Sequence, residues 1–195
     1  GGFCAQLVDS LSGKILRIDP PAGDVVPSNP LFDPTNPGAA RSKVWALGNR
    51  NPFRMTLRSE SGSHVPADAN PGALYIGDVG WGLREELNIC KGPGQNFGWP
   101  TFEGVGTEPQ YSTYPVAVVA NQDAPNPLFP GAGCSQYLGF NNLLKQNTSV
   151  LANKPPFNNP CAPAQKIPAS IPQFLHSPPV LDWAHLTTQA RTWKF

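Results

Sequence analysis

Four segments between Trp45 and Pro100 decide how this chain is organised. They are residues 45–54 (WALGNRNPFR), 74–80 (LYIGDVG), 84–89 (REELNI) and 94–100 (GQNFGWP). Short apolar runs in these segments are followed by glycines and polar residues that are typical of turns. This pattern predicts consecutive strands of an antiparallel sheet, with the functional residues on the connecting loops.

The strands can be placed from the alternation of polar and apolar residues. An early strand is expected at residues 14–19, where Pro20 ends the run because proline cannot donate to a sheet ladder. Further strands are predicted at residues 44–47, 53–58, 73–77 and 85–90. These four would form one antiparallel unit over residues 44–90, in simple up-and-down order.

A single four-stranded sheet exposes both faces and would be marginally stable alone, so it needs similar sheets stacked against it. The fold class predicted is therefore all-β, with sheets stacked as the blades of a β-propeller. Residues 1–43 would be the end of one blade and a loop, residues 44–90 one four-stranded blade, and residues 91–195 the next blade. A long insertion rich in proline and asparagine is expected at about 105–170.

Composition limits the classes of function. The chain has 195 residues and a net charge of +1, which gives no electrostatic case for binding nucleic acid or an anionic membrane. No apolar run approaches the roughly 20 residues that a membrane span requires. The chain begins Gly1-Gly2-Phe3-Cys4, without an initiator methionine or signal-peptide pattern, and we expect it to be an internal part of a longer protein.

The four cysteines favour an oxidising compartment. Cys4, Cys90, Cys134 and Cys161 show neither a CxxC motif nor a spacing typical of zinc ligands. Cys134 and Cys161 flank one long irregular segment, so theirs is the preferred pairing among the three possible connectivities. A secreted or periplasmic location is expected.

The same four segments, in this order and at compatible spacing, resemble the glucose/sorbosone dehydrogenase family. Residues 7–19 and 178–191 resemble the family segments on either side, and residues 105–170 diverge. The resemblance implies a six-bladed propeller that oxidises sugars with pyrroloquinoline quinone (PQQ), and it implies that this chain covers about two of the blades. The pattern is also similar to hedgehog-interacting-type propellers, some of which are binding proteins and not enzymes.

Arg50 and Asn51 are the candidate cofactor-binding residues. PQQ is a planar tricarboxylate with an ortho-quinone, and a guanidinium offers bidentate, permanently charged donors for such a group. The resemblance implies that Arg50 and Asn51 contact the quinone. The structural alternative is an Asn-Pro turn beside an exposed arginine.

Gly80 and Trp81 are the candidate metal-binding residues. The resemblance implies that their backbone carbonyls hold a calcium ion against the cofactor, and calcium accepts such oxygen ligands readily. Family members usually have proline where Trp81 stands, but a main-chain ligand does not depend on the side chain. The structural alternative is a tight turn with an aromatic plug.

No catalytic residue is assigned within the chain. Glu85 and Glu86 are adjacent on a predicted strand, so their side chains point to opposite faces and cannot share one proton-transfer site. The resemblance implies a histidine base upstream of residues 7–19. His64, His176 and His185 do not correspond to it, and we expect His64 to be exposed and the other two to pack or cap.

Two functions are compatible with these motifs. The first is a PQQ-dependent dehydrogenase that oxidises a sugar hydroxyl and passes electrons to an external acceptor, with the rest of the propeller or neighbouring subunits as partners. The second is a non-catalytic extracellular propeller that acts as a binding or structural module, with the insertion as its binding surface.

Overall fold

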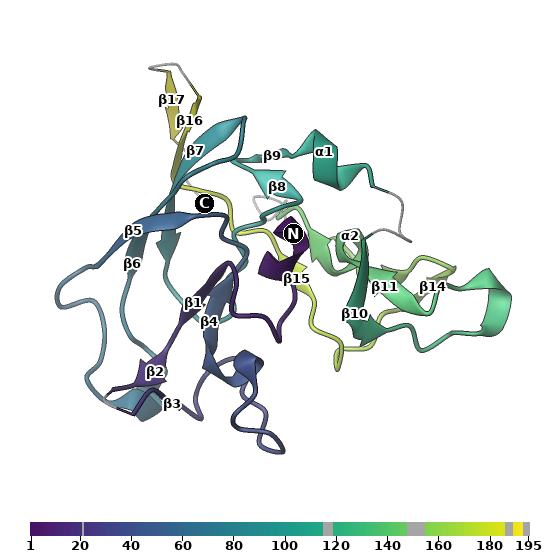
Figure 1. The fold of residues 1–195 in the computed structure, drawn as a ribbon, viewed down its shortest axis with the longest axis horizontal. Coiled ribbons are helices and arrows are strands. Elements are labelled where there is room, and N and C mark those ends of the chain that lie inside the picture. Colours follow the sequence, from purple (N-terminus) through teal and green to yellow (C-terminus); the bar gives the residue numbers. More distant parts are fainter. Residues whose placement is uncertain (21, 115–118, 148–154, 186–188, 193–195) are drawn as a thin grey trace.

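A computed structural model of the chain describes residues 1–195 except 21, 115–118, 148–154, 186–188 and 193–195 (Figure 1). Strands dominate the described residues, and the α-helices there are two short ones, α1 (Pro109–Ser112) and α2 (Phe140–Leu143). The 3-10 helices are η1 (Gly2–Ala5), η2 (Ala40–Lys43), η3 (Pro66–Asp68) and η4 (Gly131–Gly133). The prediction of an all-β chain is confirmed.

The largest element is a five-stranded antiparallel sheet in the order β17-β16-β7-β6-β5. Its strands are β5 (Pro52–Leu57), β6 (Leu74–Asp78), β7 (Arg84–Cys90), β16 (Leu181–Ala184) and β17 (Ala190–Thr192). The first three follow one another in the chain, as the alternating pattern predicts. β16 returns after a long excursion and pairs with β7, where Asp182 lies opposite Glu86.

The prediction that residues 44–47 belong to this same sheet is wrong. β4 (Val44–Leu47) pairs instead with β1 (Lys14–Leu16) in a separate two-stranded sheet. All four residues of β4 are buried, whereas every residue of β5 is exposed. A continuous apolar run needs cover on both faces, and it obtains this inside the core beside Ile76, Cys90 and Phe97. The division of the chain into blades stays a prediction.

Gly48 turns the chain out of β4 toward the site. Its φ of 80° lies in the left-handed region, which favours glycine. A Cβ here would also overlap the side chain of Asn96 and the backbone of Phe97. Asn96 forms a parallel bridge with Leu47 on one side and with His176 on the other, so three distant segments meet at this point.

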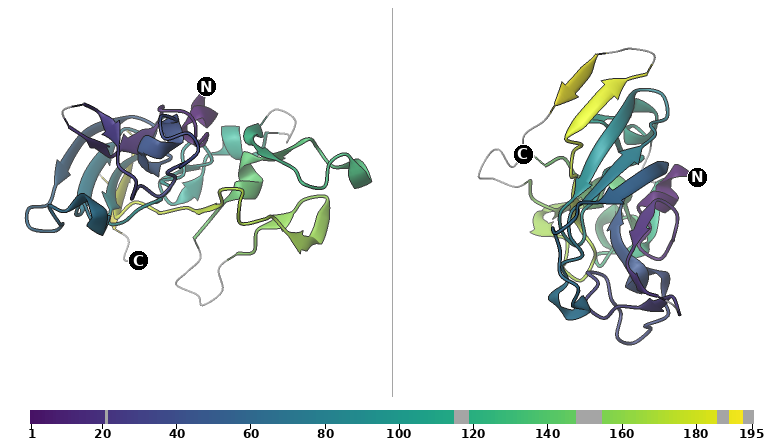
Figure 2. Two further views of the ribbon diagram at one scale, coloured as in Figure 1. Left: turned by 90° about the horizontal axis from the view of Figure 1, so that it is seen from below. Right: turned by 90° about the vertical axis from the view of Figure 1, so that its left-hand side faces the viewer.

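The expected insertion contains small sheets and a core of its own. Across the chain, the remaining paired strands are β2 (Ile18–Asp19) with β3 (Asp24–Val25), β8 (Phe102–Glu103) with β9 (Gly106–Thr107), β10 (Ala120–Pro125) with β11 (Tyr137–Gly139), β12 (Leu144–Lys145) with β15 (Phe174–Leu175), and β13 (Asn158–Asn159) with β14 (Ala162–Lys166). Ala124, Leu138, Leu143 and Ile167 form the second core. The strands β10, β11 and β14 lie to the right of the five-stranded sheet in Figure 1, and Figure 2 shows the same separation.

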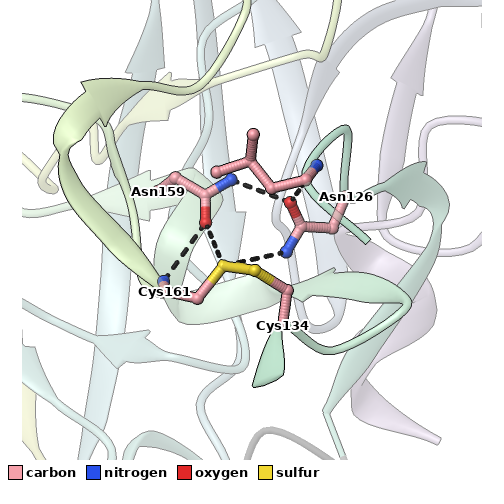
Figure 3. Close-up of a disulfide and its surroundings, with 5 residues drawn as sticks. Asn126, Cys134, Asn159 and Cys161 are labelled. Atoms are coloured by element: carbon pink, nitrogen blue, oxygen red, sulfur yellow. Dashed lines mark hydrogen bonds between the residues drawn. A yellow bond between two sulfur atoms is a disulfide. The ribbon is translucent and has the colours of Figure 1, made fainter. Parts of the chain in front are cut away.

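A disulfide closes this part of the chain. Cys134 and Cys161 are bonded, which confirms the preferred pairing (Figure 3). Beside the disulfide the Asn159 side-chain amide donates to the Asn126 side-chain oxygen at 2.8 Å. Cys4 and Cys90 are free thiols. The disulfide thus joins the β13–β14 hairpin to the segment between β10 and β11.

We predict that replacing both Cys134 and Cys161 by serine destabilises this insertion. The bridge spans 27 residues of sequence, and removing a crosslink over a loop of that size costs about 3–4 kcal/mol, chiefly through the entropy of the unfolded chain. Amide hydrogen exchange should accelerate in β10, β11 and β14 while β5, β6 and β7 keep their protection. The matched control is Cys4→Ser, which removes a thiol but no crosslink, and equal protection of the insertion in both proteins would contradict the prediction.

Candidate functional site

The predicted cofactor and metal residues lie on two neighbouring turns. Residues 48–51 leave β4, and residues 79–83 connect β6 to β7. The Val79 amide donates to the Asn51 carbonyl at 3.0 Å, and Arg50 Nη1 donates to the Val79 carbonyl at 2.9 Å. The structure therefore brings Arg50 and Asn51 beside Gly80 and Trp81.

Asp78 fixes the turn that carries Arg50 and Asn51. Its Oδ2 accepts from the Arg50 amide at 2.9 Å, and its Oδ1 accepts from the Asn51 amide at 2.6 Å. The carboxylate is almost fully buried at the end of β6. Burial raises the pKa of Asp78 to about 6, and the two backbone hydrogen bonds oppose that rise because they favour the charged form. The residues Arg50 and Asn51 themselves remain exposed.

Glu103 fixes the second turn. Its Oε1 accepts from four consecutive backbone amides: Trp81 at 2.6 Å and Gly82, Leu83 and Arg84 at 3.1 Å each. The preceding amide, that of Gly80, donates to Glu85 Oε2 at 3.0 Å. A Cβ at Gly80 would overlap the Arg84 carbonyl and the Glu103 carboxylate, so only glycine fits this position.

Aromatic rings line the edge beside these turns. The Trp81 ring lies 5.6 Å from Trp99 and 5.2 Å from Tyr111, and Trp99 lies 5.3 Å from Tyr111. The Arg50 guanidinium carbon is 5.7 Å from the centre of the Trp99 ring, within the range of a cation–π interaction. Trp81 is 47% exposed, whereas Trp99 is buried. Trp81 thus offers an exposed flat apolar surface beside Trp99, the ring that the Arg50 guanidinium contacts.

The residues present suit a planar acid such as PQQ and offer part of a ligand set for calcium. Arg50 and Asn51 offer a guanidinium and an amide to the carboxylates and quinone oxygens of a planar acid, and aromatic rings stand beside them. The amides of Trp81 and Gly82 are already bonded to Glu103, so the carbonyls of Gly80 and Trp81 are the polar groups that these two peptides can offer to a cation. The described residues do not include a group of three or more His, Cys, Asp or Glu side chains that could hold a metal ion. Calcium takes six to eight oxygen ligands, so two carbonyls would be a partial set.

Glu85 and Glu86 have separate surroundings, as their adjacent positions on β7 predict. Glu85 Oε1 lies 3.1 Å from His185 Nε2. Glu86 is buried and accepts from the Gly104 amide and, at 3.0 Å, from Asn88 Nδ2. Burial raises the pKa of Glu86 to about 8. The two carboxyl groups do not form a joint acid–base site.

The three histidines lie apart from the predicted cofactor residues. His64 is exposed on the β5–β6 connection, as expected. His176 is fully buried, stacks on Phe102 at 4.5 Å and shares a hydrogen bond of 2.7 Å with Gln146. Burial lowers the pKa of His176 to about 3, so the ring is neutral. His185 pairs with Glu85, and in the part of the chain that the structure describes the contacts of these histidines do not include Arg50 or Asn51.

Two residues that organise the site, Asp78 and Glu103, were not predicted from the sequence. Asp78 lies inside the 74–80 segment, and a polar residue at a strand end beside a glycine-rich turn was the available signal. Glu103 lies just before the divergent region, and no local pattern points to its contact with residues 81–84. Its role depends on a tertiary contact between Glu103 and residues 81–84, which the spacing of residues in the sequence does not predict.

Fold and site together define an all-β protein with a loop-borne site of a guanidinium, backbone carbonyls and aromatic rings. Residues 4–129 match the family described as Glucose / Sorbosone dehydrogenase, and the chain belongs to this family. It is 36% identical over 115 residues to the HIPL2 protein of Arabidopsis thaliana, a match that covers 51% of this chain and 15% of that protein. It is 31% identical over 96 residues to Aldose sugar dehydrogenase YliI of Escherichia coli, covering 49% of this chain and 22% of that protein.

Solved structures give similar matches. The PQQ-bound aldose sugar dehydrogenase from Streptomyces coelicolor aligns with a TM-score of 0.41 and 31% identity, covering 54% of this chain and 25% of that one. The apo-form of the soluble aldose sugar dehydrogenase from Escherichia coli aligns with a TM-score of 0.41 and 28% identity, covering 60% and 28%. The matches thus span less than a third of each of these relatives. Among the described residues of the chain, no helix is long and apolar enough to cross a membrane.

We predict that Asp78→Ala destabilises the protein by about 1–3 kcal/mol. The change removes the buried carboxylate that accepts from the Arg50 and Asn51 amides, and the loss of hydrogen bonds to a charged group carries a penalty of this size. Chemical denaturation measures the loss. The control is Asp24→Ala at an exposed position, which should stay within about 0.5 kcal/mol of the parent. Equal stability of both variants would show that Asp78 does not hold the turn.

We predict that Glu86 makes the folded state less stable as pH rises. Its pKa is near 8 in the folded protein against an ordinary value of 4.5, so the folded state holds the proton over a window in which the unfolded state releases it. The stabilisation of the folded state by protonated Glu86 is complete below pH 4.5 and is lost as pH rises to about 8. Over this range the free energy of unfolding falls by at most about 1.4 kcal/mol per pH unit.

Glu86→Gln should remove this slope. The Gln amide can donate to Asn88 Oδ1, which has no partner among the described residues, once the Asn88 amide rotates. Urea unfolding of both proteins from pH 5 to pH 8 measures the difference. Parallel stability curves for the two proteins would refute the prediction.

Proposed function

We propose that the full-length protein is a PQQ-dependent sugar dehydrogenase. It would oxidise a sugar hydroxyl, transfer hydride to the quinone and pass electrons to an external acceptor. The observation that carries this proposal is the meeting of two turns at one edge, with Arg50 and Asn51 on one turn and Gly80 and Trp81 on the other. Membership of the glucose/sorbosone dehydrogenase family supports it.

The residues would divide the binding of the cofactor and metal between them. Arg50 and Asn51 would hold PQQ, and the carbonyl oxygens of Gly80 and Trp81 would be calcium ligands. When bound, PQQ would supply the hydride acceptor, and calcium would supply a Lewis acid. The chain's own part is to bind and orient: Asp78 holds the Arg50–Asn51 turn, and Glu103 holds the Gly80–Trp81 turn.

The remaining parts of the reaction are assigned by analogy with the family. The base that removes the hydroxyl proton would be a histidine outside this chain, since the contacts of its own histidines do not include Arg50 or Asn51. A secreted or periplasmic location is supported by the Cys134–Cys161 disulfide, which needs an oxidising compartment to persist.

A second function is favoured by Trp81. It stands where the family usually has proline, and its exposed ring packs against Trp99 and Tyr111. An extracellular propeller that binds a partner without catalysis could use this aromatic edge and the disulfide-closed insertion. In that case the Arg50–Asn51 turn would be scaffold alone.

Calorimetric titration of PQQ into the full-length protein, with and without calcium, separates the two functions. We expect calcium-dependent binding that Arg50→Ala weakens about tenfold or more, because a charge-assisted hydrogen bond contributes about 1.5–3 kcal/mol. Arg58→Ala is the matched control, since Arg58 is an exposed arginine just beyond the far end of β5. Absence of PQQ binding to the folded protein would overturn the dehydrogenase proposal and favour the second function.

A further inference from the structure

Glu103 occupies an unusual position behind the Gly80–Trp81 turn. The residue is only 3% exposed, and a single oxygen of its side chain accepts from the four amides of residues 81–84. A run of backbone amides that converge on one point forms a concave anion-binding nest. Here the anion is supplied by the chain itself, from the end of β8. Figure 1 shows β8 and β9 beside β7, the strand that follows this turn.

The direction of these amides fixes the direction of the two candidate metal ligands. In a trans peptide the C=O and the following N–H lie in one plane and point in opposite directions. The Trp81 amide belongs to the same peptide as the Gly80 carbonyl, and the Gly82 amide to the same peptide as the Trp81 carbonyl. Since both amides point at Glu103 Oε1, both carbonyls point away from it.

The peptide before this pair follows the same arrangement on the Arg50 side. The Gly80 amide donates to Glu85, and the Val79 carbonyl in that peptide accepts from Arg50 Nη1 at 2.9 Å. A carbonyl of this run is therefore directed to the guanidinium that would bind the cofactor. The side chains of Glu85 and Glu103, which accept from the amides, therefore lie on the side of the turn opposite to the carbonyl oxygens.

Trp81 has a part in this arrangement that proline could not have. Its amide makes the shortest of the four bonds to Glu103, at 2.6 Å, and proline has no N–H to donate. The residue that departs from the usual family pattern is thus the one held most closely by Glu103. Its carbonyl keeps a defined direction even though the side chain has changed.

From this geometry we infer that Glu103 is a positioning residue for a calcium site formed by the Gly80 and Trp81 carbonyls. The inference rests on the proposed function and adds to it a residue that neither coordinates the metal nor touches the cofactor. The Glu103 side chain is long enough for its carboxylate to accept from the Trp81 and Gly82 amides. Because these amides point toward Glu103, the Gly80 and Trp81 carbonyl oxygens point away from it. Calcium suits such carbonyl ligands.

Two variants separate the reach of the side chain from its charge. Glu103→Gln keeps the length of the side chain and an acceptor oxygen but removes the charge. The new side-chain amide can donate to the neighbouring Glu108. Burial and the closeness of Glu103 raise the pKa of Glu108. Glu103→Asp keeps the charge but is one methylene shorter, so its carboxylate cannot reach all four amides. Glu86→Gln is the matched control, because Glu86 is a buried carboxyl of β7 that contacts Gly104 and Asn88 and not the turn.

Calcium chloride is titrated calorimetrically into the full-length protein with PQQ present. We expect the calcium affinity of Glu103→Gln to stay within about threefold of the parent, and that of Glu103→Asp to fall about tenfold or more, which corresponds to about 1.4 kcal/mol. Glu86→Gln should match the parent. The reverse order, with Glu103→Asp near the parent and Glu103→Gln weakened, would show that charge alone matters and would overturn the inference.

Failure of this inference differs from failure of the proposed function. If the parent binds calcium and Glu103→Asp binds it equally well, only the role of Glu103 is refuted. If the parent binds neither PQQ nor calcium, the proposed function is refuted, and the positioning role with it. Amide hydrogen exchange without ligand provides a second readout: residues 81–84 should exchange faster in Glu103→Asp and remain protected in Glu103→Gln, and unchanged exchange in Glu103→Asp would contradict the inference.

Discussion

The carboxylate of Asp78 joins the two turns on which the candidate site depends. One oxygen holds the Arg50 amide and the other holds the Asn51 amide, so the end of β6 determines where the exposed guanidinium and amide side chains lie. The adjacent contacts, from Val79 to Asn51 and from Arg50 to Val79, follow from that placement. Asp78 is therefore the polar anchor that fastens the turn after β4 to the five-stranded sheet.

Other buried acidic side chains also accept hydrogen bonds from loop amides. Glu103 receives four backbone amides, and Glu86 receives the Gly104 amide. A chain with 24 prolines and 19 glycines has many backbone groups outside regular ladders, and buried amides must still find acceptors. Acidic side chains that reach back to loop amides meet this need and hold the loops in defined shapes.

Local patterns predicted what depends on local chemistry. The strands β5, β6 and β7 were predictable from the alternation of residue types, and the Cys134–Cys161 disulfide was the preferred pairing. The pairing of β4 with β1 and the pairing of β16 with β7 could not be predicted from the sequence. Which distant strands pair depends on how they are buried in the folded chain, and the alternation of residue types within one strand does not give that information. Arg50, Asn51, Gly80 and Trp81 were selected by family resemblance, and their roles stay predictions. Glu103 could not be selected, since only the folded chain brings it to residues 81–84.

A structure of the full-length protein crystallised with PQQ and calcium tests most directly whether these two turns form one cofactor site. We predict a PQQ oxygen within hydrogen-bonding distance of the Arg50 guanidinium and a calcium ion bonded to the Gly80 and Trp81 carbonyls at about 2.3–2.6 Å. PQQ bound at another place, with both carbonyls free of metal, would contradict this prediction.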